Sequence, residues 1–90
     1  MSYAVEVSHR ADKVLGRLDR KSAARIREKI DQLSLNPYER RISDELEMIK
    51  GQRYSRAGDW RIVYEVREAE KILFIGTIQH RSRVYKDLKK

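Results

Sequence analysis

Apolar residues follow two different periods along the first third of the chain. Residues 2–8 (SYAVEVS) have the period of two that indicates a β-strand, because Tyr3, Val5 and Val7 alternate with Ala4 and Glu6. From Ser8 or His9 the spacing changes to steps of three and four residues, which is typical of amphipathic helices. The two apolar faces consist of Ala11, Val14, Leu15 and Leu18, and then of Ala23, Ile26, Ile30 and Leu33. This pattern predicts a strand followed by a helical hairpin.

Two local signals mark the limits of the second helix. Ser22 is a predicted N-cap, because its hydroxyl can accept a bond from a backbone N–H in the first turn. Asn36 precedes Pro37, and the residue before a proline is pushed out of the α region. We therefore expect the helix to end there.

The second half of the chain has the pattern of β-structure. Residues 46–51 (LEMIKG) suggest a short strand or the approach to one, and residues 57–59 (AGD) a tight turn. Ile62, Tyr64 and Val66 then alternate with their neighbours, and the polar residues 67–71 (REAEK) separate this run from a second one at 72–78, which predicts a hairpin. The last ten residues are expected to form a strand end and a short helix.

These elements predict one α+β domain over residues 1–90. It comprises an N-terminal strand, a helical hairpin, an antiparallel sheet of three to four strands and a short C-terminal helix, with the helices on one face of the sheet. Strict alternation along the last strand puts Ile72, Phe74, Ile78 and His80 on one side and Leu73, Ile75, Thr77, Gln79 and Arg81 on the other. We expect a site only where the strand ends become polar.

The positive charge is unevenly distributed. The net charge is +7, but residues 1–49 hold 10 Lys/Arg against 9 Asp/Glu, whereas residues 50–90 hold 11 against 5. Such a one-sided charge favours a polyanion such as nucleic acid, although it also serves solubility. With no Cys and two His, the chain predicts neither disulfides, thiol chemistry, a metal site nor a cofactor. No secretory segment or membrane span is apparent, so we expect a cytoplasmic protein.

An ordered set of short stretches in the second half of the chain resembles a known family. The chain has a basic–aromatic run (KGQRYSRA), GDWR at 58–61, an alternating strand, a polar turn, a second apolar strand and HRSRVY at 80–85. In this order, preceded by a strand and a helical hairpin, these pieces resemble the RelE/ParE toxin superfamily, in particular the RelE-like mRNA interferases. The resemblance covers essentially the whole chain.

The resemblance implies a small basic toxin, held in a hetero-oligomer by a partly disordered RelB-like antitoxin. Such a toxin enters the ribosomal A site on the small subunit and cuts mRNA there without a metal ion. Residues that match the family pattern are Arg56, Arg61, Arg81 and Tyr85, with His80 at a position occupied by His or Lys. Tyr54 stands where relatives often have a basic residue.

The chemistry of RNA cleavage agrees with these residue types. The 2′-hydroxyl attacks the adjacent phosphorus, so one proton must be removed, one returned to the leaving 5′-oxygen, and negative charge stabilised on the phosphoryl oxygens. Arg61 and Arg81 suit the last task, while His80 and Tyr85 suit the proton transfers. The predicted catalytic residues are therefore Arg61, His80, Arg81 and Tyr85, and the predicted RNA contacts are Arg53, Tyr54, Arg56, Arg83 and Lys86.

Each assignment has an alternative. His80 can be a surface residue at a strand end, Tyr85 can pack, and Arg61 can pair with Glu65. At the level of function, the alternatives are a noncatalytic ParE-like poison of DNA gyrase and a degenerate toxin that binds only antitoxin or RNA. Arg61 and Arg81 are expected to be exposed at strand ends, so Arg61→Ala and Arg81→Ala should each remove most cleavage and leave the fold intact.

Overall fold

The computed structural model describes residues 2–46 and 49–82. Its elements are β1 (Ala4–Val7), α1 (His9–Arg17), α2 (Arg20–Leu35), β2 (Asp44–Glu45), β3 (Gln52–Ala57), β4 (Trp60–Arg67), a 3₁₀ turn (Glu68–Glu70) and β5 (Ile72–His80). The predicted α+β class and the order of strand, helical hairpin and antiparallel strands are confirmed. No helix within the described residues is long and apolar enough to cross a membrane.

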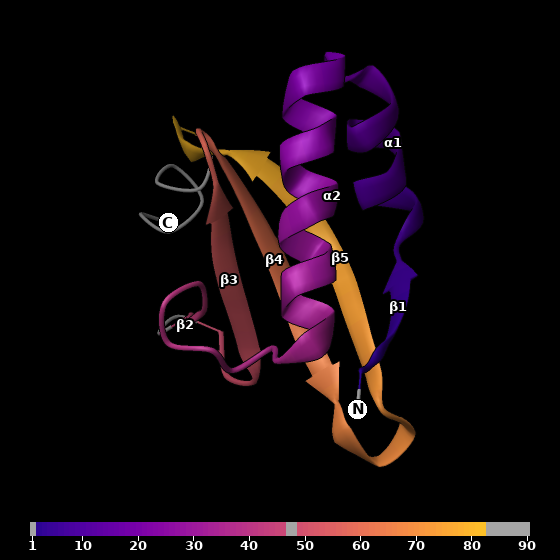
Figure 1. Cartoon of the computed structure of the whole chain (residues 1–90), viewed down its shortest axis with the longest axis vertical. Helices are drawn as coiled ribbons and strands as arrows, with labels where there is room; N and C mark the ends of the chain where they lie inside the picture. The colour runs from indigo at the N-terminus through magenta and orange to yellow at the C-terminus, as the bar shows by residue number, and fades with distance from the viewer. Residues whose placement is uncertain (1, 47–48, 83–90) are drawn as a thin grey trace.

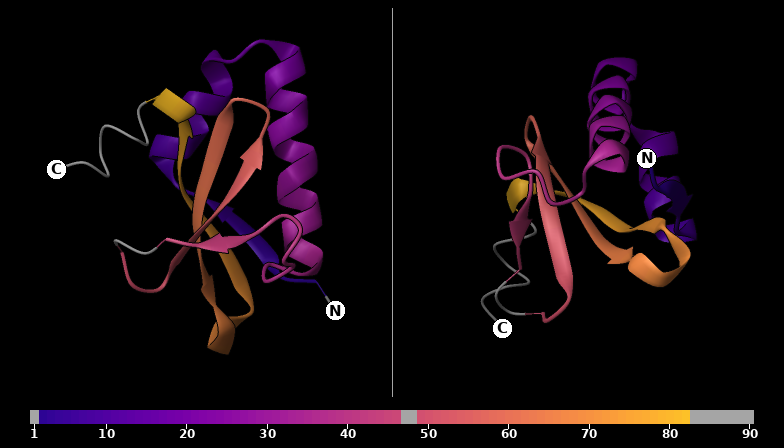
Figure 2. Two further views of the ribbon diagram at one scale, coloured as in Figure 1. Left: turned by 90° about the vertical axis from the view of Figure 1, so that its left-hand side faces the viewer. Right: turned by 60° about the horizontal axis from the view of Figure 1, so that its bottom comes forward.

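The strands form one sheet in the order β1-β5-β4-β3-β2. The last four strands pair antiparallel with their sequence neighbours, as predicted, whereas β1 pairs parallel to β5 with Val7 opposite Ile75. Figures 1 and 2 show that both helices cover the same face of the sheet, with α2 in front of its middle and α1 on the side of β5 and β1. The opposite face carries no helix among the described elements.

Side-chain caps begin both helices. Ser8 caps α1, because its Oγ accepts a bond of 3.0 Å from the N–H of Ala11. Asp19, and not the predicted Ser22, caps α2: its carboxylate accepts a bond of 3.1 Å from the N–H of Ser22. Ser22 lies one turn inside the helix, where its N–H is one of the donors that a cap must satisfy. The helix ends at Leu35, as the following Asn36 and Pro37 predicted.

The core lies between the helices and the sheet. Its buried members include the predicted helix positions Ala11, Leu15, Ile26, Ile30 and Leu33, together with Ile62, Tyr64, Leu73, Ile75 and Ile78 from β4 and β5. Tyr64 is buried with its hydroxyl satisfied, because it donates to the carbonyl of Pro37 at 2.7 Å and bonds the hydroxyl of Ser43. Desolvation raises the pKa of this phenol, so it stays neutral. These contacts anchor the connection after α2 to the sheet.

A β-bulge in β5 reverses the side-chain alternation expected there. Val63 lies opposite Thr77 and Tyr64 opposite Ile75, so Gly76 has no residue opposite it on β4. Leu73 and Ile75 before the bulge and Ile78 after it are therefore buried on the same, helix-covered side. The predicted grouping of Phe74 with Ile78 is wrong, because the extra residue shifts the period by one.

Two predicted elements differ from the structure or lie outside it. The strand suggested at residues 46–51 begins earlier and has two residues, Asp44 and Glu45, after which the N–H of Leu46 donates to the carbonyl of Gln52 at 2.9 Å. The chain turns before β3 at Gly51, whose φ of +86° favours glycine. The predicted C-terminal helix falls on residues 83–90, which lie outside the described residues.

Candidate nucleic-acid interface

Strand register brings three of the predicted residues to the sheet face opposite the helices. Arg56 of β3 lies directly opposite Arg61 of β4, and Tyr54 lies opposite Val63 on the same side. In turn, Arg61 lies opposite Gln79 of β5. Paired residues point to the same face of a sheet, so these side chains form one surface, which we call the open face.

The central member of the open face is Arg61. Its residue is only 6% exposed, and its guanidinium carbon lies 5.1 Å from the centroid of the Tyr54 ring. Stacking of this kind holds the planar guanidinium in one orientation. The expectation that Arg61 is a surface residue is therefore wrong, and Glu65 pairs with Arg67 instead of Arg61. A fixed, permanently charged fork suits two hydrogen bonds to one phosphate.

Arg56 differs from its cross-strand neighbour because it is exposed. No carboxylate pairs with its guanidinium among the described residues. Like charges directly opposite on a sheet are unfavourable, which makes a bound anion between Arg56 and Arg61 stabilising. The two arginines and the Tyr54 ring therefore form a cationic and aromatic surface suited to a phosphate and a neighbouring base.

Arg53 does not belong to this surface. It lies opposite Tyr64 and shares its side of the sheet, where its Nε donates to the hydroxyl of Ser43 at 2.7 Å. Its guanidinium also pairs with Glu45 at 3.6 Å and lies 5.3 Å from the Tyr38 ring centroid. These contacts place Arg53 on the helix-covered side with an ion pair to Glu45, so Arg53 is not part of the open face, and an RNA contact at Arg53 stays a prediction.

His80 and Arg81 lie where β5 ends. The His80 ring meets the Trp60 ring edge to face at 5.3 Å between centroids, and its Nδ1 lies 3.2 Å from the Ser82 hydroxyl. His80 lies opposite Trp60, one register position away from Arg61 and on the helix-covered side, so the structure does not bring this ring to the open face. Arg81 is exposed, and its N–H donates to the carbonyl of Asp59 at 2.8 Å, which holds it beside the turn between β3 and β4.

The remaining predicted residues, Arg83, Tyr85 and Lys86, lie outside the described residues. One open-face residue was not predicted, namely Gln79 opposite Arg61. Gln79 lies on the open face because of the bulge at Gly76, and strict alternation along the sequence did not predict it as a site residue. Within residues 2–46 and 49–82, His, Cys, Asp and Glu side chains form no group of three that could hold a metal ion.

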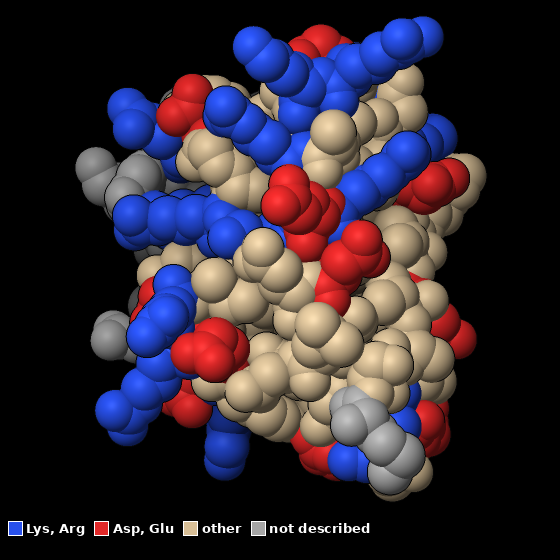
Figure 3. All heavy atoms as spheres, viewed as in Figure 1, with Lys and Arg blue, Asp and Glu red and all other residues tan. Residues whose placement is uncertain are grey.

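Charges are paired differently at the two ends of the molecule. Near the turn between β4 and β5, Arg67 pairs with Glu65 and Glu6, and Lys71 with Glu68. Near the turn between β3 and β4, the described part of the chain gives Arg25, Lys29 and Arg56 no ion-pair partner. On the helix-covered side, Lys and Arg side chains gather toward the top and left of the molecule (Figure 3). Cations without an ion-pair partner among the described residues therefore surround the end that carries the site.

Comparisons with known proteins agree with this arrangement. The chain is 26% identical to a chain of the archaeal RelE–RelB complex from Pyrococcus horikoshii OT3, with a TM-score of 0.77 over 92% of this chain and 99% of that one. The RelBE2 toxin–antitoxin complex from Mycobacterium tuberculosis contains a chain with 25% identity and a TM-score of 0.77, over 90% and 100% of the two chains. The isolated Escherichia coli RelE toxin shares the fold, with 18% identity and a TM-score of 0.77 over 98% and 96%.

The comparison with curated proteins found no significant match. At the level of families, the model of the ParE toxin of type II toxin–antitoxin systems, parDE, matches residues 5–85. This match spans the helical hairpin, all of the sheet except the first residue of β1, and the motif that begins at His80. The chain therefore belongs to the RelE/ParE superfamily and is a toxin of a type II toxin–antitoxin system.

Proposed function

We propose that this toxin is a ribosome-dependent endoribonuclease that cleaves mRNA in the A site. The observation that supports it is the open face, where the buried Arg61 is stacked on Tyr54 beside the exposed Arg56. A preorganised cation in a partly desolvated position stabilises developing negative charge more strongly than a mobile surface charge does. The open face therefore provides the electrostatic part of phosphodiester cleavage.

In the proposed reaction, the 2′-oxygen of the substrate forms a bond to the adjacent phosphorus, and the bond from phosphorus to the 5′-oxygen breaks. The 2′-hydroxyl loses its proton and the leaving 5′-oxygen gains one, so the products are a 2′,3′-cyclic phosphate and a 5′-hydroxyl. Arg61 and Arg81 hold the phosphoryl oxygens, and Tyr85 is the proposed group for proton transfer. Tyr54 stacks on a base, and Arg56, Arg83 and Lys86 bind backbone phosphates.

His80 has a subordinate place in this scheme. Its ring faces Trp60 on the helix-covered side, away from the stacked Arg61. We therefore expect His80→Gln to lower cleavage less than Arg81→Ala does. The ribosome supplies part of the substrate's orientation, since few acid–base groups are available on the toxin itself.

The proposed partners follow from this function and from the relatives. Two similar structures are complexes of RelE-like toxins with their antitoxins, so we propose a RelB-like antitoxin for this chain. The other partners are the small ribosomal subunit and mRNA, and the site of action is the cytoplasm.

A second candidate function is poisoning of DNA gyrase through protein contact. It is favoured by the family model, which is that of the ParE toxins, and by the separation of His80 from the open face. A gyrase poison has no need of a stacked, buried arginine beside an exposed one, and for this reason we prefer the ribonuclease.

Cleavage of a defined message on purified ribosomes separates the two functions. We expect the wild-type toxin to cut mRNA positioned in the A site. Arg81→Ala should lower the rate by roughly two to three decades, because it removes one charge-assisted contact to the phosphate. Lys13→Ala, which removes an exposed charge from α1, is the matched control and should retain full activity.

Fully active Arg81→Ala protein would contradict the phosphate clamp. If messages stay intact while purified gyrase is inhibited in a supercoiling assay, the gyrase function replaces the ribonuclease. Thermal melting of each variant shows that the compared proteins are folded.

A further inference from the structure

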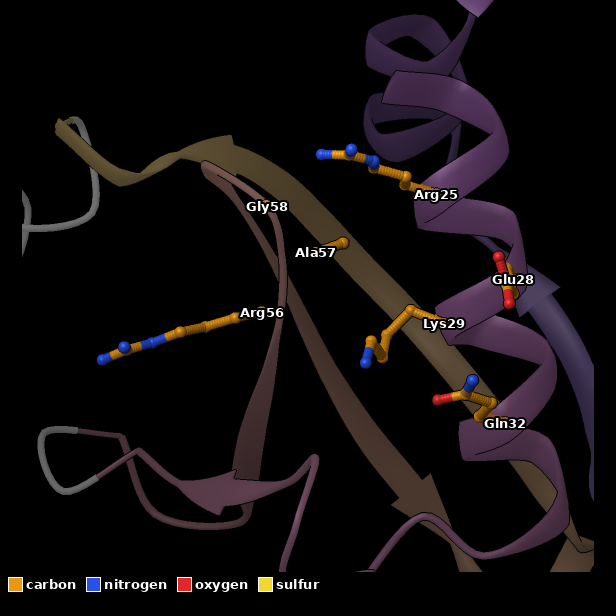
Figure 4. Close-up of a pocket in the computed structure, with 7 residues that line it drawn as sticks. All are labelled: Arg25, Glu28, Lys29, Gln32, Arg56, Ala57 and Gly58. Atoms are coloured by element: carbon orange, nitrogen blue, oxygen red, sulfur yellow. The ribbon is translucent and has the colours of Figure 1, made fainter. Parts of the chain in front are cut away.

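A groove lies between α2 and the free edge of β3. Arg25, Glu28, Lys29 and Gln32 of α2 line one side, and Arg56, Ala57 and Gly58 line the other, around a volume of about 300 Å³. In Figure 4, Arg25 and Lys29 extend from the helix toward β3, whereas the Arg56 side chain extends away from the helix on the far side of the strand. Arg56 thus stands between this groove and the open face.

A second hollow continues the groove along the same strand edge. It also measures about 300 Å³ and shares Lys29 and Arg56 with the first, while Arg41, Ile42, Asp44, Tyr54 and Ser55 complete its lining. Tyr54 is the residue that stacks on Arg61. A continuous basic groove therefore leads from the candidate site, over the edge of β3, to α2. We call it the edge groove.

The edge groove exists because β2 is short. The pairing of β2 with β3 is limited to Arg53 and Tyr54, so beyond them no other strand within residues 2–46 and 49–82 pairs with this edge. The carbonyl of Gln52 accepts a bond from Leu46 on the β2 side, and backbone groups alternate in direction along a strand. The N–H of Arg56 therefore points to the uncovered edge. It adds a backbone donor next to the side-chain cations.

Arg25 is seated against the turn between β3 and β4. Its Nη1 lies 3.4 Å from the position where a side chain on Gly58 would place its Cβ, and Gly58 has a φ of +64°. Glycine in this turn thus admits both the left-handed backbone and the close approach of the guanidinium. The result is a cation held near the entrance of the groove.

The charge and polarity of the lining indicate the ligand. Arg25, Lys29 and Arg41, with Arg56 at the boundary to the open face (Figure 4), outnumber the two acidic residues, Glu28 and Asp44. Within the described residues, none of these four guanidinium or ammonium groups has an ion-pair partner. The part next to α2 offers only Ala57 and Gly58 as nonpolar residues, whereas protein partners usually need buried apolar anchors. In this part of the groove, cations and a backbone N–H without apolar anchors match a phosphate backbone, whereas Ile42 and Tyr54 line the second hollow.

We propose that the edge groove is a second RNA-backbone site, in which Arg25, Lys29 and Arg41 bind phosphates beyond those held on the open face. The choice of RNA as the ligand rests on the proposed function. The groove adds to that function a second surface, next to the open face, that the RNA backbone can contact. The phosphates come either from the mRNA strand that passes through the site or from ribosomal RNA against which the toxin docks. Both present the same chemistry to the groove.

The test uses the double variant Arg25→Ala/Lys29→Ala in the full-length toxin. Its matched control, Arg10→Ala/Lys13→Ala, removes the same charge from α1, on the side of the sheet edge formed by β5 and β1. Alanine favours helix formation, so both proteins should keep their helices, which circular dichroism verifies. The probes are a fluorescent single-stranded RNA of about 12 nucleotides with 2′-O-methyl groups, which cannot be cut, and ribosomes without mRNA.

We expect the double variant to lose two phosphate contacts. The slope of log affinity against log salt should fall by about 1.4, at about 0.7 per phosphate of a single strand, while the control keeps the wild-type slope. If the double variant binds the short RNA more weakly, the groove binds the mRNA strand. If it binds only the ribosomes more weakly, the groove binds ribosomal RNA. Either result supports the inference.

Two outcomes would overturn it. The first is an unchanged affinity and slope for both probes. The second is a double variant that binds RNA normally but loses affinity for an acidic antitoxin segment, because the groove would then hold protein. In either case, the proposed function stands if the wild-type protein cuts mRNA on ribosomes. If the wild-type protein does not cut mRNA but its salt slope depends on Arg25 and Lys29, the proposed function is rejected and the RNA-binding groove stands.

Discussion

Two arginines that face each other across β3 and β4 have different structural roles. Arg61 is buried and stacked on Tyr54, whereas Arg56 is exposed and has no ion-pair partner among the described residues. Charged groups are seldom buried unless other groups compensate for the lost hydration. Arg61 therefore belongs to the packing of the open face as well as to its chemistry.

This difference predicts unequal effects on stability. Arg61→Ala should lower the free energy of unfolding by about 1–2 kcal/mol, because it removes a partly desolvated cation–π contact and its packing. Arg56→Ala should change it by no more than about 0.5 kcal/mol, as is usual for an exposed residue. Urea denaturation of the two variants measures both values. Equal stability of the variants would show that the stacked position contributes nothing to folding.

At the scale of elements, the bulge at Gly76 decides which residues of β5 face the helices. Gly76 is also tied to α1, because the Ser8 hydroxyl that caps this helix donates to the Gly76 carbonyl at 2.7 Å. One residue thus sets the register of the strand end and the entry of the first helix. The open face depends on the same bulge, since it places Gln79 opposite Arg61.

Inserting one alanine between Thr77 and Ile78 should reverse the facing of residues 78–80. Ile78 would turn out of the core, which alone costs about 2–3 kcal/mol of burial. Deleting Gly76 should cost less, because it removes the bulge but keeps Ile75 and Ile78 on the helix-covered side. Urea denaturation and near-ultraviolet circular dichroism of both variants test this. An insertion variant as stable as the deletion variant would contradict the assigned facing.

At the scale of the whole molecule, Glu68 joins segments that are distant in sequence. Its carboxylate accepts bonds from the hydroxyls of Tyr3 at 2.7 Å and Tyr38 at 2.6 Å, and the Lys71 ammonium lies at 3.1 Å. These contacts link the start of the chain, the connection after α2 and the turn before β5. The Tyr38 hydrogen bond, followed by those of Tyr3 and Lys71, lowers the pKa of Glu68 to about 2.

This lowered pKa predicts a contribution to acid stability. A carboxyl with a lower pKa in the folded state stabilises the fold above its ordinary value of 4.5, and the contribution is lost as the pH falls from there to about 2. The melting temperature of the wild type should therefore fall more steeply over this range than that of Glu68→Gln. Melting curves at matched ionic strength test this. Parallel curves for the two proteins would show that the Glu68 contacts do not survive in solution.

The sequence by itself determined the elements, most of the core, the concentration of charge in the second half and the superfamily. Strand and helix periods and the end of α2 before Pro37 depend on residues a few positions apart, so they can be predicted along the chain, whereas the cap of α2 was assigned to Ser22 instead of Asp19. Arg56, Arg61 and Tyr54 were predicted as site residues from their places in the family pattern. Their shared face follows from the pairing of β3 with β4 across the turn at Gly58.

Only the tertiary structure decided which cations remain available and which faces the side chains occupy. Arg53 and Arg56 are equivalent by composition, but the first meets Glu45 and Ser43 while the second stands at an uncovered edge. The His80 ring faces Trp60 because of a bulge four residues earlier in β5. Arg25 lies next to Gly58 because α2 packs on β3. Register, bulges and ion pairs depend on contacts between distant segments, and no local pattern specifies them.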